Sequence, residues 1–172
     1  LLYKKNKPLN ISNLNIEANL LMQISKKDFL MYTPYHSFSY LVAFLRQSAI
    51  DPNVKSIKIT LYRLSKNSNV ISSLINAAKN GKKVLVQIEL QARFDEENNI
   101  RIAEMLKLAG VELIFGVKGL KVHSKICLIE RRDNNKKKFY GFISTGNFNE
   151  STAEVYTDYT LFTSNQGILK DV

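Results

Sequence analysis

The sequence predicts an α/β fold, a mixed β-sheet flanked by helices, from two observations about where its apolar residues lie. Between residues 37 and 115, stretches with an apolar residue at every second position alternate with stretches whose apolar residues recur every three or four positions. These are the spacings of strands and helices. After residue 120 only the strand spacing remains. Strands that alternate with helices are typical of parallel βαβ units, whereas strands joined by short polar turns pair antiparallel.

Three helices are predicted, and each ends at a residue that disfavours helical backbone. The first ends before the Asp51-Pro52 pair, because proline restricts the residue that precedes it. The second and third end at Gly81 and Gly110, since glycine readily adopts the left-handed conformation found just past a helix. The helices span 37–50, 68–80 and 95–109, with inward apolar residues Phe38, Leu41, Val42, Leu45 and Ala49, then Ile71, Leu74, Ile75 and Ala78, then Ile102, Met105, Leu106 and Ala109.

Six strands are predicted, in two groups of three. The first three are separated by the helices and are expected to run parallel. The last three are separated by shorter polar segments and are expected to be antiparallel additions. The charged segment 133–138 is interpreted as the solvated tip of a hairpin, because it combines turn-forming and charged residues. The strands span 54–62, 83–90, 111–115, 120–129, 139–144 and 155–162.

Length and composition suit one domain with a core: the chain has 172 residues, of which 45% are hydrophobic and 23% charged. We interpret residues 1–30, which lack strong periodicity, as a leading segment of the domain formed by residues 31–172, and the whole as a fragment of a longer multidomain protein. No apolar run approaches the about 20 residues that cross a bilayer. The single cysteine, Cys127, cannot form an internal disulfide. A cytoplasmic location is therefore expected.

The formal net charge of +10 favours a polyanionic partner. Nucleic acid, the acidic surface of a membrane and a phosphate-rich small molecule all fit this charge. Residues 118–138 hold eight basic residues against two acidic ones. No helix-turn-helix, RRM or zinc-finger pattern accompanies the charge, so a nucleic-acid-binding module ranks last. Peripheral association with a membrane remains compatible with it.

A histidine and a lysine two residues apart form the most distinctive chemical pair. His123 and Lys125 precede the apolar run 126–129, and side chains two apart on a strand share a face. We therefore expect them to point the same way, so that the imidazole can attack a phosphoryl group while the ammonium holds phosphate oxygens. The alternative is a surface histidine on a basic strand. Cys127, inside the run, is interpreted as a small core residue.

Two arginines follow strands of successive βαβ units. Arg63 comes just after the strand 54–62, and Arg93 just after the strand 83–90. Ligands of parallel α/β sheets bind at the carboxyl ends of strands, and a guanidinium binds phosphate oxygens through two parallel hydrogen bonds. The two side chains can therefore converge on one anion. The alternative for each is a structural ion pair, such as Arg93 with Asp95.

Small polar residues follow the strand 139–144. Thr145 and Asn147, on either side of a glycine, can present hydrogen-bond donors to a phosphate or orient the imidazole. The alternative is a plain turn. Tyr156 can stack on a base, although a core position is the better default for it. His36 is interpreted as a local capping or packing residue at a helix start.

The pair His123 and Lys125 with the later Thr145-Gly146-Asn147 turn resembles the phospholipase D superfamily signature. In that superfamily the histidine is the nucleophile and forms a phosphohistidine. The superfamily's aspartate, five residues after the lysine, falls on Glu130. This departure weakens the alternative function, a phospholipase D-like phosphodiesterase or nuclease that uses the same histidine.

A longer set of segments is similar to polyphosphate kinases of the first family. That resemblance implies a phospholipase D-like domain in an enzyme that reversibly moves the terminal phosphate of ATP to inorganic polyphosphate, giving ADP. It implies that His123 is autophosphorylated, with Lys125 as a further clamp on phosphate, and that Tyr156 contacts the nucleotide. The segments, in order, are 33–38, 51–54, 60–63, 89–100, 119–125, 145–149 and 156–158.

The family also associates Arg63 and Arg93 with magnesium and phosphate. A guanidinium has no lone pair to give a cation, so we interpret both arginines as phosphate clamps whose phosphates hold Mg²⁺, alongside Thr145 and Asn147. One departure is Phe142, where family members can carry a histidine. The chain resembles only the first of two phospholipase D-like C-terminal domains, so it is expected to be inactive alone and to belong to a longer, homo-oligomeric enzyme.

Overall fold

The computed structural model describes residues 7–63, 65, 67–89, 96–116, 119–134 and 136–172. Within these residues one seven-stranded mixed sheet has the order β1-β7-β6-β5-β2-β3-β4. The predicted fold class is confirmed, including parallel pairing of β2, β3 and β4 and antiparallel pairing of the later strands. The strands are β1 (Phe29–Thr33), β2 (Val54–Leu61), β3 (Lys83–Ile88), β4 (Glu112–Phe115), β5 (Ile126–Asp133), β6 (Lys136–Ser144) and β7 (Asp158–Thr163).

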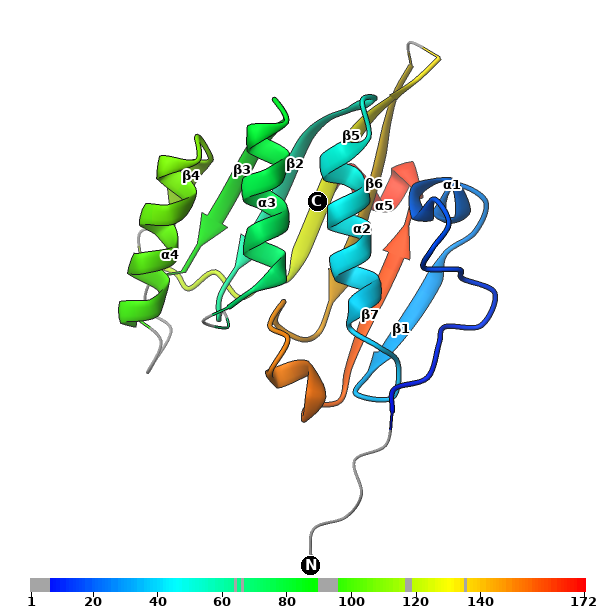
Figure 1. Ribbon diagram of the computed structural model, residues 1–172, viewed down its shortest axis with the longest axis horizontal. Coiled ribbons are helices and arrows are strands. Elements are labelled where there is room, and N and C mark those ends of the chain that lie inside the picture. Colours follow the sequence, from blue (N-terminus) through cyan, green and yellow to red (C-terminus); the bar gives the residue numbers. More distant parts are fainter. Residues whose placement is uncertain (1–6, 64, 66, 90–95, 117–118, 135) are drawn as a thin grey trace, which may run out of the picture.

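Strand directions place the carboxyl ends of β2, β3, β4 and β6 at one edge of the sheet, together with the first residues of β5 and β7. We call this the catalytic edge, after the role predicted from the sequence for the residues that it carries. The β5–β6 hairpin projects at the opposite edge (Figure 1). At the catalytic edge lie Arg63, the pair His123 and Lys125, the turn that begins at Thr145, and Tyr156. The segment 51–54 instead lies at the start of β2, at the opposite edge, and residues 90–95 lie outside the described residues.

Helices α2, α3 and α4 lie side by side on one face of the sheet (Figure 1). Between them and the sheet lies the core, where the predicted alternation holds: Ile57, Ile59 and Leu61 of β2 are all buried. Gly81 and Gly110 follow α3 and α4 with φ of +76° and +83°, as expected for residues past a helix end. The helices are α1 (Leu20–Ile24), α2 (Ser39–Ile50), α3 (Asn69–Lys79), α4 (Glu96–Leu108), α5 (Gln166–Leu169) and a 3-10 turn η1 (Thr152–Glu154).

Residues before position 30 carry more structure than their weak periodicity indicated. Asn19 caps the short helix α1 through its side chain, which accepts a hydrogen bond from the Met22 N–H. β1 is an outermost strand of the sheet and pairs with β7. A five-residue helix and a five-residue strand are too short to show a periodic pattern. Apolar side chains of this segment join the common core, among them Ile11, Leu14, Leu20, Leu21, Ile24 and Phe29.

Several local predictions were wrong. β6 begins at Lys136 rather than at residue 139, because residues 136–138 of the predicted hairpin tip pair with β5. β5 begins at Ile126 rather than at residue 120, so residues 121–125 form no strand. β7 begins at Asp158 rather than at residue 155, because η1 and a turn occupy the preceding residues. Met105 is 41% exposed, since the inward face of α4 is formed by Ile102, Ala103 and Leu106 instead.

Candidate active site

The catalytic edge brings together side chains that are far apart in the sequence. Arg63 lies two residues beyond β2, Lys125 directly precedes β5, and Thr145 directly follows β6. Because β5 pairs with both β2 and β6, Lys125 enters the sheet between the other two. The Ser144 N–H donates to the Lys125 carbonyl over 2.8 Å, which extends the β5–β6 pairing to the end of the strands. The pairing of these three strands thus places Arg63, Lys125 and Thr145 at neighbouring strand ends.

His123 and Lys125 do not share a face, contrary to the strand prediction. The His123 side chain is exposed, whereas Lys125 is only 5% exposed. The Lys125 ammonium turns back and donates a hydrogen bond to the carbonyl of His123. Both side chains contact the ring of Tyr62: the imidazole stands edge-on to it at 5.4 Å between centroids, and the Lys125 Nζ lies 5.5 Å from its centroid. An aromatic ring therefore links the two groups.

Burial of Lys125 has an electrostatic consequence. Removing the ammonium from water disfavours its charged form, and this burial lowers the pKa of Lys125, while the Asp158 carboxylate acts in the opposite direction. An ammonium has three donors, and only one is used by the His123 carbonyl in the hydrogen bonds that the structure records for it. A phosphate oxygen brought to this group would gain a charge-assisted hydrogen bond in a poorly solvated setting.

Thr60 holds the segment that carries His123 and Lys125. Its hydroxyl donates to the Ser124 carbonyl over 2.7 Å and accepts from the Ile126 N–H over 3.1 Å. One buried side chain, 7% exposed, therefore satisfies two main-chain groups on either side of Lys125. Residues 121–125 lack regular hydrogen bonding of their own, so their conformation depends on such contacts from β2.

Glu89 fixes the same segment from β3. It is 5% exposed, and its carboxylate accepts the Val122 N–H over 3.2 Å. The fully buried side chain of Asn99, on α4, donates to the carbonyls of both Tyr62 and Glu89 over 3.0 and 3.1 Å. Two buried polar residues thus tie the ends of β2 and β3 to the loop before β5.

The turn after β6 is closed by a carboxylate. The Thr145 hydroxyl donates to Asp158 over 2.8 Å and accepts from the Tyr159 N–H over 3.0 Å. Gly146 permits this approach, since a Cβ there would stand 2.2 Å from the Asp158 carboxylate. The Thr145 hydroxyl is thereby engaged in the turn itself. Within the described residues, the buried Oδ1 of Asn147 has no hydrogen-bond partner.

Glu150 joins the turn after β6 to the start of α3. One of its oxygens accepts from the Ser65 hydroxyl over 2.6 Å, and the other accepts the main-chain N–H groups of Asn69 and Val70 and the Ser68 hydroxyl. A carboxylate at a helix N-terminus satisfies orphaned donors and suits the helix dipole. Glu150 therefore fixes the loop that begins with Arg63 relative to the loop that holds Asn147.

The remaining predicted residues have mixed outcomes. Tyr156 is 60% exposed, so the core position preferred for it from the sequence was wrong, and its ring is open to a ligand. Arg93 lies outside the described residues. His36 has the expected local role, because its Nδ1 accepts the Tyr32 N–H over 3.0 Å. Cys127 is fully buried as predicted, and this burial raises the pKa of its thiol.

Phe142 and Glu130 are two residues at which the sequence departs from the families it resembles. The structure places Phe142 in the core and Glu130 in the β5–β6 hairpin. Phe142 is fully buried among Phe44, Phe148 and Phe162, with ring centroids 4.9 to 5.6 Å away. An aromatic core position therefore stands where other sequences can carry a histidine. Glu130 lies in β5, five residues from Lys125, and pairs with Lys137 over 2.8 Å. It belongs to the β5–β6 hairpin and not to the catalytic edge.

No group of three or more histidine, cysteine, aspartate or glutamate side chains among the described residues is placed to hold a metal ion. The described part of the catalytic edge offers an ammonium, a guanidinium, a hydroxyl and an amide, which suit phosphate. The carboxylates of Glu89 and Asp158 accept hydrogen bonds from the Val122 N–H and the Thr145 hydroxyl. Across the same described ranges, no helix has both the length and the apolar character needed to cross a membrane.

The architecture is that of a phospholipase D-like α/β protein. The chain superposes on a phospholipase D family member from Salmonella typhimurium with a TM-score of 0.63 at 18% identity, covering 84% of this chain and 88% of that one. Within this class the family is narrower. Residues 19–172 match the family described as Polyphosphate kinase C-terminal domain 1. The chain belongs to this family, as the ordered sequence segments indicated.

Individual relatives agree. A polyphosphate kinase from Escherichia coli strain K12 is 52% identical over 149 residues, which is 87% of this chain and 22% of that protein. The crystal structure of polyphosphate kinase from Porphyromonas gingivalis superposes with a TM-score of 0.84 at 43% identity, covering 97% of this chain and 28% of that one. The chain thus spans between 22% and 28% of the length of these relatives.

Proposed function

We propose that this chain is a catalytic domain of a polyphosphate kinase, which reversibly transfers the γ-phosphate of ATP to inorganic polyphosphate through a phosphohistidine at His123. The observation that carries the proposal is the pairing of an exposed imidazole with a buried ammonium through the Tyr62 ring at the catalytic edge. Membership of the polyphosphate kinase family supports it. Of the two histidines in the chain, only His123 lies in this setting, because His36 is used locally by Tyr32.

The first step forms a bond between an imidazole nitrogen of His123 and the γ-phosphorus, and breaks the bond from that phosphorus to the oxygen of ADP. The terminal oxygen of polyphosphate then attacks the phosphohistidine, which restores the imidazole and lengthens the chain by one phosphate. Lys125 and Arg63 stabilise the oxygens on which negative charge is carried during both transfers. Arg93 is proposed for the same role from the family resemblance alone.

Residues in the turns at the catalytic edge make smaller contributions to substrate binding. Asn147 is proposed to donate its amide N–H groups to a phosphate oxygen, and the exposed ring of Tyr156 is suited to contact the nucleotide base. Thr145 positions the turn through Asp158 and Tyr159 rather than reaching outward, so we assign its effect on phosphate to the turn's geometry.

Magnesium fits this site only through its substrate. Mg²⁺ prefers phosphate oxygens, carboxylates and water at octahedral geometry. The carboxylates of Glu89 and Asp158 accept hydrogen bonds from the Val122 N–H and the Thr145 hydroxyl, and no group of three potential metal-ligating side chains is placed among the described residues. Arg63, Arg93 and Lys125 would hold the phosphates to which the ion is bound. When bound, the ion neutralises charge on the β- and γ-phosphates.

The wider setting is also part of the proposal. The whole enzyme contains further domains, which supply the rest of the active site, so this chain alone does not turn over. We propose a homo-oligomeric parent enzyme in the cytoplasm, with ATP, ADP and polyphosphate as its ligands and with peripheral membrane contact compatible with the basic charge.

The test compares matched histidine variants of the full polypeptide. Incubation with γ-labelled ATP is expected to label the wild type at an acid-labile site and to leave His123→Asn unlabelled. His36→Asn is the matched control, since an asparagine oxygen can replace the Nδ1 that accepts the Tyr32 N–H, and it should label normally. Acid-labile label that persists in His123→Asn would overturn the nucleophile assignment.

A second measurement distinguishes the proposed phosphotransfer from the alternative phosphodiesterase activity. A phospholipase D-like phosphodiesterase would use the same histidine to cleave a bis-ester and release the cleaved product. Hydrolysis of a bis-ester phosphate by the full polypeptide, without transfer of phosphate from ATP to polyphosphate, would favour that function instead.

A further inference from the structure

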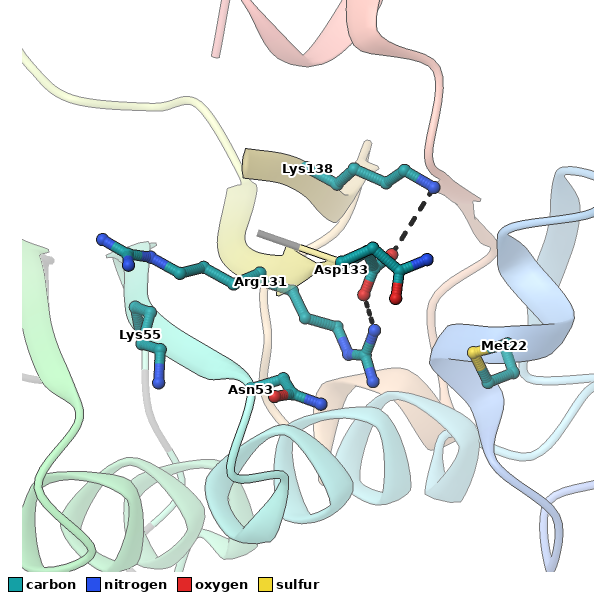
Figure 2. Close-up of a pocket in the computed structure, with 8 residues that line it drawn as sticks. Met22, Asn53, Lys55, Arg131, Asp133 and Lys138 are labelled. Carbon is teal, nitrogen blue, oxygen red and sulfur yellow. Dashed lines mark ion pairs between the residues drawn. The ribbon is translucent and has the colours of Figure 1, made fainter. Parts of the chain in front are cut away.

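A second basic surface lies at the edge of the sheet opposite the catalytic edge. A cavity of about 710 Å³ opens where the β5–β6 hairpin meets the start of β2 and the helix α1. We call it the hairpin cavity. Figure 2 shows side chains from β5, β6 and the segment before β2 around it. Its polar lining includes Asn53, Lys55, Arg131, Arg132, Asn134 and Lys138.

The cations of the hairpin cavity divide into a fixed set and an exposed set. Arg131 is held by two carboxylates, because it pairs with Asp51 over 2.9 Å and with Asp133. In Figure 2 both Arg131 and Lys138 converge on Asp133. The Tyr140 hydroxyl donates to the same carboxylate over 2.8 Å. These contacts neutralise the charge of Arg131 and hold its side chain in place at the base of the cavity.

The exposed cations of the hairpin cavity retain hydrogen-bond donors for a ligand. Lys55 is exposed and gives one hydrogen bond to the Pro52 carbonyl over 3.0 Å, which leaves two of its three donors. The Arg132 side chain is exposed, while its main chain is fixed by the Asn53 carbonyl over 2.9 Å. Lys138 lies 3.6 Å from Asp133, a loose pairing for a side chain that is 51% exposed. The cavity therefore presents positive charge on a fixed scaffold.

We propose that the hairpin cavity binds a distal segment of linear polyphosphate, so that a long chain contacts this domain at both edges of the sheet. This inference rests on the proposed function. Four cations and two amides line the cavity beside one carboxylate, Asp133, and one apolar side chain, Met22. The excess of positive charge suits a flexible polyanion, and none of these lining residues is an aromatic side chain that could stack on a nucleoside base. β5 begins next to Lys125 at the catalytic edge and runs to Arg131 and Arg132 at the cavity, so the six to seven residue steps between these side chains span about 20–23 Å.

This geometry makes the effect depend on chain length. A polyphosphate long enough to reach from one edge to the other gains the second contact, and its two contacts reinforce each other through effective concentration. ATP and tripolyphosphate are too short to make both. The cavity thereby favours long chains without touching the site of phosphoryl transfer.

The test removes exposed charge from the cavity and compares it with equal charge removed elsewhere. The double variant Lys55→Gln/Arg132→Gln of the full polypeptide spares Arg131, whose loss would leave Asp51 and Asp133 unpaired. The matched control is Lys79→Gln/Lys107→Gln, which removes two exposed lysines from the ends of α3 and α4. Binding of long-chain polyphosphate, tripolyphosphate and ATP is measured for each protein at fixed salt.

The cavity variant should bind long-chain polyphosphate about 3- to 10-fold more weakly, with unchanged binding of tripolyphosphate and ATP and a normal acid-labile label from ATP. Unchanged affinity for the long chain would overturn the inference, as would an equal loss in the control variant or an equal loss for the short ligands. Those results would leave the phosphohistidine intact. Absence of label from the wild type would instead overturn the proposed function, and with it this inference.

Discussion

The ring of Tyr62 stands edge-on to the imidazole of His123, with the two centroids 5.4 Å apart and the planes at 85°. The same ring lies 5.5 Å from the Lys125 Nζ. Tyr62 directly precedes Arg63 in the chain. One residue at the end of β2 thus contacts both members of the candidate nucleophile-and-clamp pair.

We expect Tyr62→Ala to slow phosphoryl transfer by about 10- to 100-fold. The reason is that the imidazole loses the surface that orients it, and the ammonium loses an aromatic neighbour. Tyr62→Phe should keep most of the activity, because the contacts are made by the ring. Labelling rates with γ-labelled ATP in the full polypeptide check this. A loss in Tyr62→Phe as large as that in Tyr62→Ala would show that the hydroxyl, and not the ring, matters.

Replacing Thr60 by valine should reduce both stability and activity. The shape is nearly kept, but the Ser124 carbonyl and the Ile126 N–H lose their partner, which costs about 1–3 kcal/mol. Thr60→Ser should behave like the wild type. Urea unfolding and phosphotransfer assays measure the two effects.

Thr163→Val provides the control, because the Thr163 hydroxyl is also buried and also accepts a main-chain N–H, that of Asn165 over 2.9 Å. It should lower stability without changing the rate of phosphoryl transfer. If Thr60→Val lowers stability alone and leaves the rate intact, its positioning role is contradicted.

The Glu150→Gln variant should be destabilised by about 1–2 kcal/mol. The amide nitrogen can turn to the Ser65 hydroxyl, which also accepts, but the variant loses the negative charge that faces the N-terminus of α3. The midpoint of chemical unfolding checks this against Glu17→Gln, which changes an exposed carboxylate. Equal unfolding midpoints for the two variants would contradict the capping role.

The lowered pKa of Lys125 predicts how anion binding depends on pH. Burial favours the neutral amine, so the ligand-free protein loses this charge at a pH below 10.5, the ordinary value for lysine. The unfolded chain holds the proton more tightly, so burial of Lys125 opposes folding below the lowered pKa and ceases to do so as pH rises toward 10.5.

We therefore expect polyphosphate binding to weaken at alkaline pH, and the weakening to move to higher pH in Lys125→Arg, because a guanidinium keeps its charge. Affinity titrations between neutral and alkaline pH test this, with Lys125→Gln as the variant that lacks the charge throughout. The same alkaline profile in Lys125→Arg and wild type would contradict the assignment.

Sequence patterns predicted the parts of this protein that depend on local order. The alternation of Ile57, Ile59 and Leu61 placed β2 correctly, and Gly81 and Gly110 marked the ends of helices. The segments with Tyr156 and with Tyr62 were predicted to belong to the site, and the structure places both at the catalytic edge. These features follow from side-chain periodicity and backbone preference, which a sequence records directly.

Tertiary contacts decided the rest. The exposure of His123 beside a buried Lys125 was missed because residues 121–125 are shaped by Thr60 and Glu89, not by strand pairing of their own. Glu150 gave no signal in the sequence, because its partners lie more than 80 positions away. The sequence by itself determined the fold class, the three long helices, the order of the strands from residue 54 onward and the family, since these depend on spacing and ordered motifs. Only the tertiary structure decided which side chains at the catalytic edge are buried, which are exposed and which contact one another. The reason is that these properties depend on which strand ends the sheet brings together.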